Sequence, residues 1–345
     1  MDFTLSDEQK MFAETARSLL VDRCTPEDWR QLLASGAARD AARWAAIVEN
    51  GLTLLLLPEA AGGLGLGELD FALIAEQAGY VALPEPLVES AGIAAPMLAA
   101  RAPDAAVLAD AGATIAIQHP ANPLVADADS AAAVLLHHEG EAWLAPAAGV
   151  QLTRVASIDP FRRLFRVEWQ REAAERLGPA DWDLALERGA LFAAAQGLGL
   201  AQRCVDMAVA YAQERQQFGK PIGSYQAVKH HLASAQVAIA FARPVVHAAA
   251  AGLAARDIHA RARVSHARIV ALEAADQAAR AALQVHGAMG YSWEVDVHLF
   301  LKRALALNGA WGTPRFHRDR IAARLFTRPN GPDQTFARES ETSHA

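Results

Sequence analysis

The sequence has few cysteines, no long apolar run and no cluster of positive charge, and each shortage excludes a class of protein. Its two cysteines, Cys24 and Cys204, have neither a Cys-x-x-Cys partner nor histidines at ligand spacing, which argues against a disulfide framework or a structural metal. No apolar run, the stretch around Leu52 to Leu57 included, approaches the roughly 20 residues of a membrane span. The net charge of −7 comes without a Lys/Arg block. We therefore expect neither membrane insertion nor a nucleic-acid partner.

The composition that remains is that of a large, mostly helical protein. The N-terminus reads Met-Asp-Phe-Thr-Leu-Ser-Asp-Glu, acidic where a secretory signal is basic, so we expect a cytoplasmic protein. Hydrophobic residues make up 52% of the chain and charged residues 21%, which excludes a mainly disordered chain. Alanine supplies much of the apolar fraction and favours helix, because its side chain loses no entropy there. At 345 residues we expect two or three packed units.

Changes in residue pattern along the chain predict three domains and a tail. Ser6 and Gln9 resemble a capping box that opens a first helix. From about Ala105 the pattern changes to short β-type runs separated by Pro, Gly and Asp, and after Asp181 long helical stretches predict a bundle. The expected units are an N-terminal helical domain at 1–104, a small β-sheet domain at 105–178, a C-terminal four-helix bundle at 179–326 and a disordered tail at 327–345. We expect strands at 114–118, 133–137 and 164–169, and long helices at about 181–213, 225–252 and 259–286.

The corner between the first two long helices carries the most specific pattern. An arginine near a helix C-terminus is favoured by the macrodipole, and Gly219 and Pro221 can end the helix. This local interpretation explains each residue separately. It does not explain why a guanidinium, an aromatic ring and an amide share one corner, in Arg215, Phe218 and Gln226. The combination suits a ligand that contains a diphosphate and a planar heterocycle.

The pattern Arg-x-x-Phe-Gly-x-Pro-Ile, followed by a Gln eleven residues after the Arg, resembles the flavin-binding signature of the acyl-CoA dehydrogenases. The resemblance implies that Arg215 contacts the FAD pyrophosphate, that Phe218 packs on the cofactor and that Gln226 lies near its adenine end. Tyr225 belongs to the same cofactor segment. In this family such contacts reach the flavin of a neighbouring subunit, so the resemblance also implies an oligomer.

A second segment, which ends the third long helix, is similar to the family's second FAD segment. Its two close glycines alone would indicate an ordinary C-cap. By the resemblance Gly287 lets the backbone approach the ligand, Gln284 supplies a polar side chain, and His286 lies between them. Thr313 completes the expected cofactor contacts. With the run Pro58-Glu59-x-x-Gly62-Gly63-x-Gly65, the resemblance spans most of residues 1 to 326.

The catalytic base of the family is missing at both of its usual positions. The family removes the proton α to a thioester carbonyl with a Glu while the β-hydrogen leaves as hydride to flavin. Counting from the second segment places Trp311 at the usual position, and the position used by some relatives matches Gly189. Glu187 is close in sequence, but two residues turn about 200° around a helix, so we expect it to face elsewhere as a solvated charge. Glu294 receives no role, and the base stays unassigned.

The sheet region also departs from the family and suggests a subgroup. The family's isoalloxazine-binding loop, Thr-Glu-Pro-x-Ala-Gly-Ser-Asp, has no counterpart there, and the nearest substitute runs from Ala113 to Pro120. The stretches 159–163 and 292–298 look like those of a subgroup from steroid and bile-acid side-chain degradation, in which two unlike subunits share complementary site halves. Our first hypothesis is the short subunit of such a hetero-oligomer, which oxidises an acyl-CoA with a base supplied by its partner.

Other interpretations stay open. The chain could be a self-sufficient homotetramer with an unrecognised base, or a non-catalytic scaffold that kept the fold. Flavin oxidases and monooxygenases on the same fold are a further class. The expected partners are an acyl-CoA substrate, electron-transfer flavoprotein as electron acceptor and a second dehydrogenase subunit. Small residues between Leu191 and Gly199 suggest room for a bulky acyl group.

Overall fold

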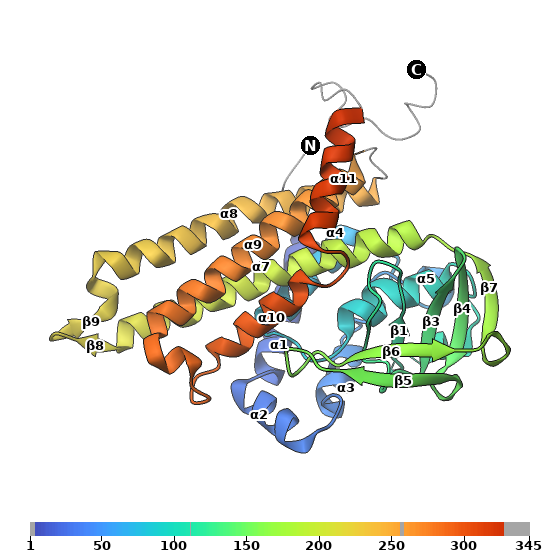
Figure 1. Cartoon of the computed structure of the whole chain (residues 1–345), viewed down its shortest axis with the longest axis horizontal. Helices are drawn as coiled ribbons and strands as arrows, with labels where there is room; N and C mark the ends of the chain where they lie inside the picture. The colour runs from blue at the N-terminus through green and yellow to red at the C-terminus, as the bar shows by residue number, and fades with distance from the viewer. Residues whose placement is uncertain (1–3, 111, 256–258, 328–345) are drawn as a thin grey trace.

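Helices build most of the molecule, and short strands form a smaller unit at one side (Figure 1). This computed structural model describes residues 4–110, 112–255 and 259–327, so the expected disordered tail lies almost entirely outside the described residues. The N-terminal part contains α1 (Asp7–Arg23), α2 (Pro26–Ser35), α3 (Ala41–Glu49), α4 (Glu68–Tyr80) and the helical stretch Val88–Ala94 that continues into α5 (Ala95–Ala99), followed by α6 (Ala106–Ala109). The capping box predicted at Ser6 and Gln9 is confirmed at the start of α1.

The strands form two small sheets with a core of their own. One has the order β1-β3-β4-β7 and the other β2-β6-β5, and within them β1 and β3 pair in parallel. The predicted strands correspond to β1 (Ile115–Ile117), β3 (Ala133–His138) and β6 (Leu164–Trp169), joined by β2 (Val125–Ala126), β4 (Glu141–Pro146), β5 (Val150–Val155) and β7 (Glu175–Pro179). Val134, Leu136 and Phe165 are among the side chains that fill the space between the sheets. Because these side chains form a hydrophobic core separate from that of the helices, the strands pack into a unit of their own.

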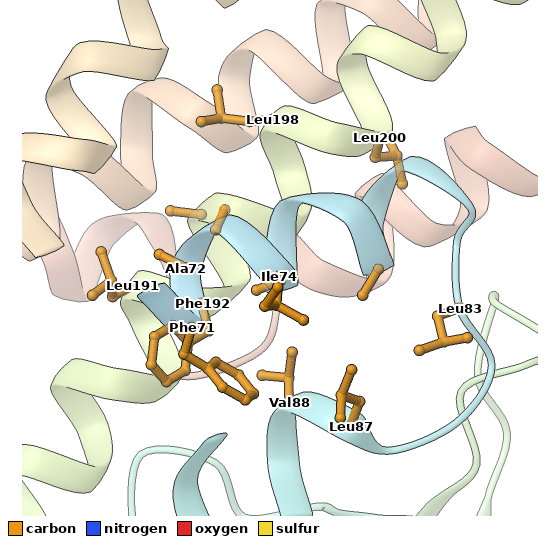
Figure 2. Close-up of a cluster of buried hydrophobic side chains, with 14 of the residues drawn as sticks. Phe71, Ala72, Ile74, Leu83, Leu87, Val88, Leu191, Phe192, Leu198 and Leu200 are labelled. Atoms are coloured by element: carbon orange, nitrogen blue, oxygen red, sulfur yellow. The ribbon is translucent and has the colours of Figure 1, made fainter. Parts of the chain in front are cut away.

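The three predicted long helices are confirmed as α7 (Trp182–Glu214), α8 (Gln226–Ala254) and α9 (Ala260–His286), and α10 (Val297–Asn308) and α11 (Pro314–Thr327) follow. The first of them is central, because α4, α8 and α9 all pack on it. Figure 2 shows part of this core, where Phe71 of α4 and Phe192 of α7 lie with ring centroids 4.7 Å apart. At Gly199 of α7 an added Cβ would lie 1.7 Å from a backbone oxygen of α4, so only glycine permits this close helix crossing. The middle of α7 is thereby held close to α4 of the N-terminal domain.

Helix α8 is less covered than its neighbours. By length and composition alone, α8 is long and apolar enough to cross a membrane. Of its most apolar 18-residue stretch, 39% is buried inside the protein. The helix is this apolar although the sequence has no long unbroken apolar run, because few charged residues interrupt its second half. Core helices of soluble bundles pass the same test, and α8 packs against α7, α9 and α4. Its other side exposes Val237 and Phe241, which leaves an apolar surface without a described neighbour.

Candidate functional site

A short hairpin projects from the end of the bundle where α7 stops and α8 begins (Figure 1). Its strands are β8 (Gln216–Gln217) and β9 (Lys220–Pro221), and both turn residues, Phe218 and Gly219, have positive φ angles of 53° and 78°. This backbone is natural for glycine but strained for phenylalanine. The Phe218 side chain is also 90% exposed. A strained and exposed aromatic residue indicates a contact surface.

Arg215 stands at the base of this hairpin with its guanidinium free. It caps α7, its backbone N–H donates to the carbonyl of Tyr211 at 2.9 Å, and the residue is exposed. It forms no ion pair within the described ranges. The hairpin around it is held in place, because the Tyr225 hydroxyl donates to the Gln217 carbonyl at 3.2 Å and the Phe218 ring lies 6.5 Å from that of Tyr225. An exposed guanidinium without an ion-pair partner, on a backbone that is held in place, is suited to binding a phosphate group.

The two segments expected to bind the cofactor lie together. The ring of His286, the last residue of α9, stacks on that of Tyr211 with centroids 4.2 Å apart, one helical turn from Arg215. Gln284 and Gln226 are both exposed. The structure therefore brings together one surface of the predicted residues: Arg215, Phe218, Tyr225, Gln226, Gln284, His286 and Gly287.

Thr313 does not join this surface. Its hydroxyl accepts a hydrogen bond from the backbone N–H of Phe316 at 3.2 Å, which caps the start of α11. The neighbouring Trp311 packs on Gly189 of α7, and Gly189 lies 26 residues before Arg215. At 1.5 Å per residue this is about 39 Å along the helix. Thr313 and Arg215 therefore lie near opposite ends of α7.

Trp311 fills the space between α7 and the sheet domain. Only 1% of it is exposed, and a Cβ added at Gly189 would lie 2.1 Å from its ring, so the indole occupies the room that a side chain there would need. The ring of His119, which follows β1, lies with its centroid 5.7 Å from that of Trp311 and 5.8 Å from that of Trp182. The two positions where the family carries its base are thus in contact, and neither holds a carboxylate.

The loop that carries Trp311 is fixed by two buried side chains. The Nη2 atom of Arg268 on α9 donates to the carbonyls of Asn308 and Ala310 at 2.9 and 2.8 Å. The His317 ring lies with Nε2 2.8 Å from the Trp311 carbonyl and Nδ1 3.0 Å from the Ser265 hydroxyl. Because a carbonyl only accepts, the proton is on Nε2 and Nδ1 accepts from the serine. Burial, with the charge of Arg268 beside it, lowers the pKa of His317 to about 4.

This lowered pKa predicts an acid-sensitive stability. The unfolded imidazole binds a proton near pH 6.5, whereas the folded one stays neutral down to about pH 4, so the stabilisation is present above pH 6.5 and is lost as the pH falls toward 4. We expect about 3 kcal/mol to be lost over this interval. Urea unfolding between pH 7.5 and 4.5 measures it. The His317→Asn variant should show a smaller pH slope, and an unchanged slope would assign the effect to other groups.

Glu187 is buried rather than solvated, so that expectation was wrong. It is 3% exposed and forms an ion pair with Arg320 of α11, and burial raises the pKa of its carboxyl. The cause is α11, which covers this part of α7 through Arg320, a contact that no local sequence pattern indicates. Its orientation toward Arg320 leaves Gly189 to face Trp311, as the helical angle predicted. The carboxylate is therefore not directed at either base position.

The stretch 159–163, which resembles a subgroup of the family, connects the sheet domain to the helices. Asp159 is buried and forms an ion pair with Arg303 of α10, and Arg162 donates to Glu89 at 3.2 Å. These pairs tie the loop between β5 and β6 to the helices. Among the described ranges no group of three or more His, Cys, Asp or Glu side chains could hold a metal ion.

Comparisons with known proteins agree on one family. The descriptions "Acyl-CoA dehydrogenase, N-terminal domain" and "Acyl-CoA dehydrogenase, C-terminal domain" match residues 6–105 and 180–326. The acyl-CoA dehydrogenase IpdE2 of Mycobacterium tuberculosis is 35% identical over 338 residues, which cover 94% of this chain and 100% of the relative. The solved ChsE4-ChsE5 complex of the same organism superposes with a TM-score of 0.84 at 24% identity, covering 96% of this chain and 100% of the other. A solved Tcur3481-Tcur3483 steroid ACAD variant gives 0.83 at 23% identity, covering 93% and 98%.

Proposed function

Because the chain belongs to the acyl-CoA dehydrogenase family, we propose that it takes part in the FAD-dependent α,β-dehydrogenation of an acyl-CoA as one of two unlike subunits. Family membership makes it an oxidoreductase and implies FAD as the cofactor. The observation that carries the proposal is the contrast between the two ends of α7. The Arg215 end presents a free, fixed binding surface, whereas the Gly189 end is filled by Trp311. The chain would supply one half of a shared site.

The residues at the hairpin fit the pyrophosphate side of FAD. Arg215 has a free guanidinium that can donate two hydrogen bonds to phosphate oxygens, and Phe218 offers an exposed ring. Gln226 and Gln284 add exposed amides on the same surface. When bound, FAD supplies acceptance of the hydride from the substrate β-carbon. The contribution of this chain is to bind and orient, which lowers the entropy cost of reaching the reacting geometry.

The proton on the α-carbon would go to a carboxylate of the partner. In this chain Trp311 and Gly189 stand at the two base positions, and Glu187 is held by Arg320. In a second copy of the same chain, Trp311 would fill the same space beside Gly189. The hairpin of one copy would therefore find no open cleft on another copy. A partner with an open cleft and a glutamate does. This argument favours a hetero-oligomer over the self-sufficient homotetramer.

The substrate and the further partners are proposed from the relatives. One structural neighbour is described as a steroid ACAD and another as a ChsE4-ChsE5 complex. We therefore propose a steroid-derived or similarly bulky acyl-CoA as substrate, with electron-transfer flavoprotein as electron acceptor. Both cysteines in the structure are buried free thiols, which suits a reducing compartment such as the cytoplasm.

Purification of the chain alone and with a longer, glutamate-bearing dehydrogenase tests the proposal. We expect a colourless chain on its own, and a flavin absorption spectrum and acyl-CoA turnover from the co-purified complex. Flavin and turnover from the isolated chain would instead establish the self-sufficient enzyme. Complex activity that is indifferent to Arg215→Ala would favour the scaffold.

The exposed side of α8 supports assembly into a larger oligomer. Phe241 is 75% exposed and follows Val237 by one helical turn, next to a groove lined by Val209 and Leu232. We expect Phe241→Asp to weaken assembly at least tenfold, because the new charge would be buried at an apolar contact. Sedimentation velocity measures the mass. Phe326→Asp, at an exposed phenylalanine of α11, serves as the control, and equal masses for all three proteins would contradict the prediction.

A further inference from the structure

A cavity of about 360 Å³ lies beside the first turns of α7. Residues of α4, α7, the end of α8 and the start of α9 line it, and none of them belongs to the hairpin surface or to the Trp311 contact. Pockets that hold small molecules begin at roughly 300 Å³. Leu184 and Leu253 form an apolar part of the wall, and most of the remaining lining residues are charged. The cavity therefore has the size and the mixed lining of a small-molecule site.

Two carboxylate oxygens on this wall have no donor within the described ranges. Glu187 is 3% exposed; its Oε1 pairs with Arg320, and its Oε2 is buried without a hydrogen-bond partner. On α4, Oε1 of Glu68 accepts both hydrogen bonds from Arg188, at 2.9 and 3.1 Å, which leaves its Oε2 open. A buried charged acceptor that is left unpaired destabilises the protein, so the site gains from a ligand that donates hydrogen bonds.

The charges around the cavity favour a cation. Three of the four acids that line it pair with an arginine. The fourth, Asp181, forms no ion pair in the part of the chain that the structure describes, which leaves one negative charge over. Among the described residues no group of three or more His, Cys, Asp or Glu side chains could hold a metal ion, which favours an organic cation. An ammonium group brings three N–H donors and no acceptor, and so matches the open oxygens.

We propose that this cavity binds an aliphatic primary amine. The ammonium group donates to Oε2 of Glu187, Glu68 offers a second acceptor on the same wall, and the carbon chain lies against the apolar part. Arg320 holds the Glu187 carboxylate in place before the ligand arrives, because it binds the other oxygen. The cavity lies apart from the surface around Arg215, and Glu187 is turned away from the base positions. The inference therefore does not depend on the proposed function.

Calorimetric titration of the full chain with n-butylammonium chloride tests the site. We expect one saturable binding event with a dissociation constant of about 1 mM, a scale that suits so small a ligand. Tetramethylammonium has the same charge but no N–H donor, and 1-butanol has the same carbon chain but no charge, so both should bind about tenfold more weakly. Heats that do not saturate, or equal binding of the two cations, would overturn the proposal and leave the cavity to water.

Glu187→Gln keeps the size of the side chain but removes its charge, and should weaken n-butylammonium binding by about tenfold. Because this change also breaks the pair with Arg320, the melting temperature shows whether the variant folds, and Glu68→Gln, which should weaken binding as well, tests the second acceptor. Glu273→Gln is the matched control, because it breaks another glutamate–arginine pair between α9 and α11, with Arg318, and should leave binding unchanged. Unchanged affinity in a folded Glu187→Gln variant, or in Glu68→Gln if the first does not fold, overturns the proposal.

Discussion

Replacing Arg215 with alanine will weaken FAD binding by the assembled enzyme by about tenfold to a hundredfold. The variant would lose the proposed charge-assisted contact with the pyrophosphate, for which we expect a net loss of about 1.5–3 kcal/mol in total. The backbone of Arg215 is held at the end of α7, and its planar guanidinium can donate two parallel hydrogen bonds to phosphate oxygens. Equilibrium titration of the apo-complex with FAD, followed by flavin fluorescence, measures the change.

Two matched variants make this result specific. Arg215→Lys keeps the charge but not the forked geometry and should bind FAD with intermediate affinity. Arg280→Ala removes an exposed arginine of the nearby α9, whose Nε lies 2.8 Å from an Asp276 oxygen, and should leave FAD binding unchanged. Equal losses in Arg215→Ala and Arg280→Ala would indicate a general charge effect instead of a pyrophosphate contact.

Replacing Trp311 with alanine will lower the free energy of unfolding by about 3–5 kcal/mol. The indole is almost fully buried and packs against Gly189. Because glycine has no side chain to fill the space, removal of the indole leaves a cavity. Because the ring is a packing element in this interpretation, the folded variant should still assemble and retain the FAD of the complex. Urea unfolding of the isolated chain gives the stability, and the flavin content of the complex gives the second quantity.

Trp293 offers the matched control, because it is 65% exposed. Trp293→Ala should change the free energy of unfolding by less than about 0.5 kcal/mol. Loss of flavin from a folded Trp311→Ala complex would contradict the packing role. Flavin binding by the isolated Trp311→Ala chain would show that the ring alone closes an otherwise sufficient cofactor cleft.

Local patterns predicted much of the fold. The long helices and several strands were predictable because apolar periodicity and the Pro and Gly breaks that bound it are properties of neighbouring residues. The surface around Arg215 was predictable for a similar reason, since most of its residues come from two short segments. The stack of His286 on Tyr211, which joins those segments, depends on how α7 and α9 pack.

Contacts between distant elements were not predictable in the same way. Glu187 and Arg320 are 133 residues apart, and nothing near either one signals the other. Trp311 and Gly189 were each recognised as positions without a base, but their contact was missed. The sequence did contain one indication of this contact: Trp311 is very large and Gly189 has no side chain. In a close-packed interior, a large residue on one side of a contact often faces a small residue on the other.

The separation of the two surfaces along α7 also determines how much cofactor an assembly can hold. A homomeric enzyme with an open cleft and a hairpin on every chain would bind one flavin per chain. Here each copy brings a hairpin and a filled space, so an assembly with equal numbers of the two proposed subunits would bind one flavin for every two chains. The ratio of flavin to protein in the purified complex would then be half that of such a homomer.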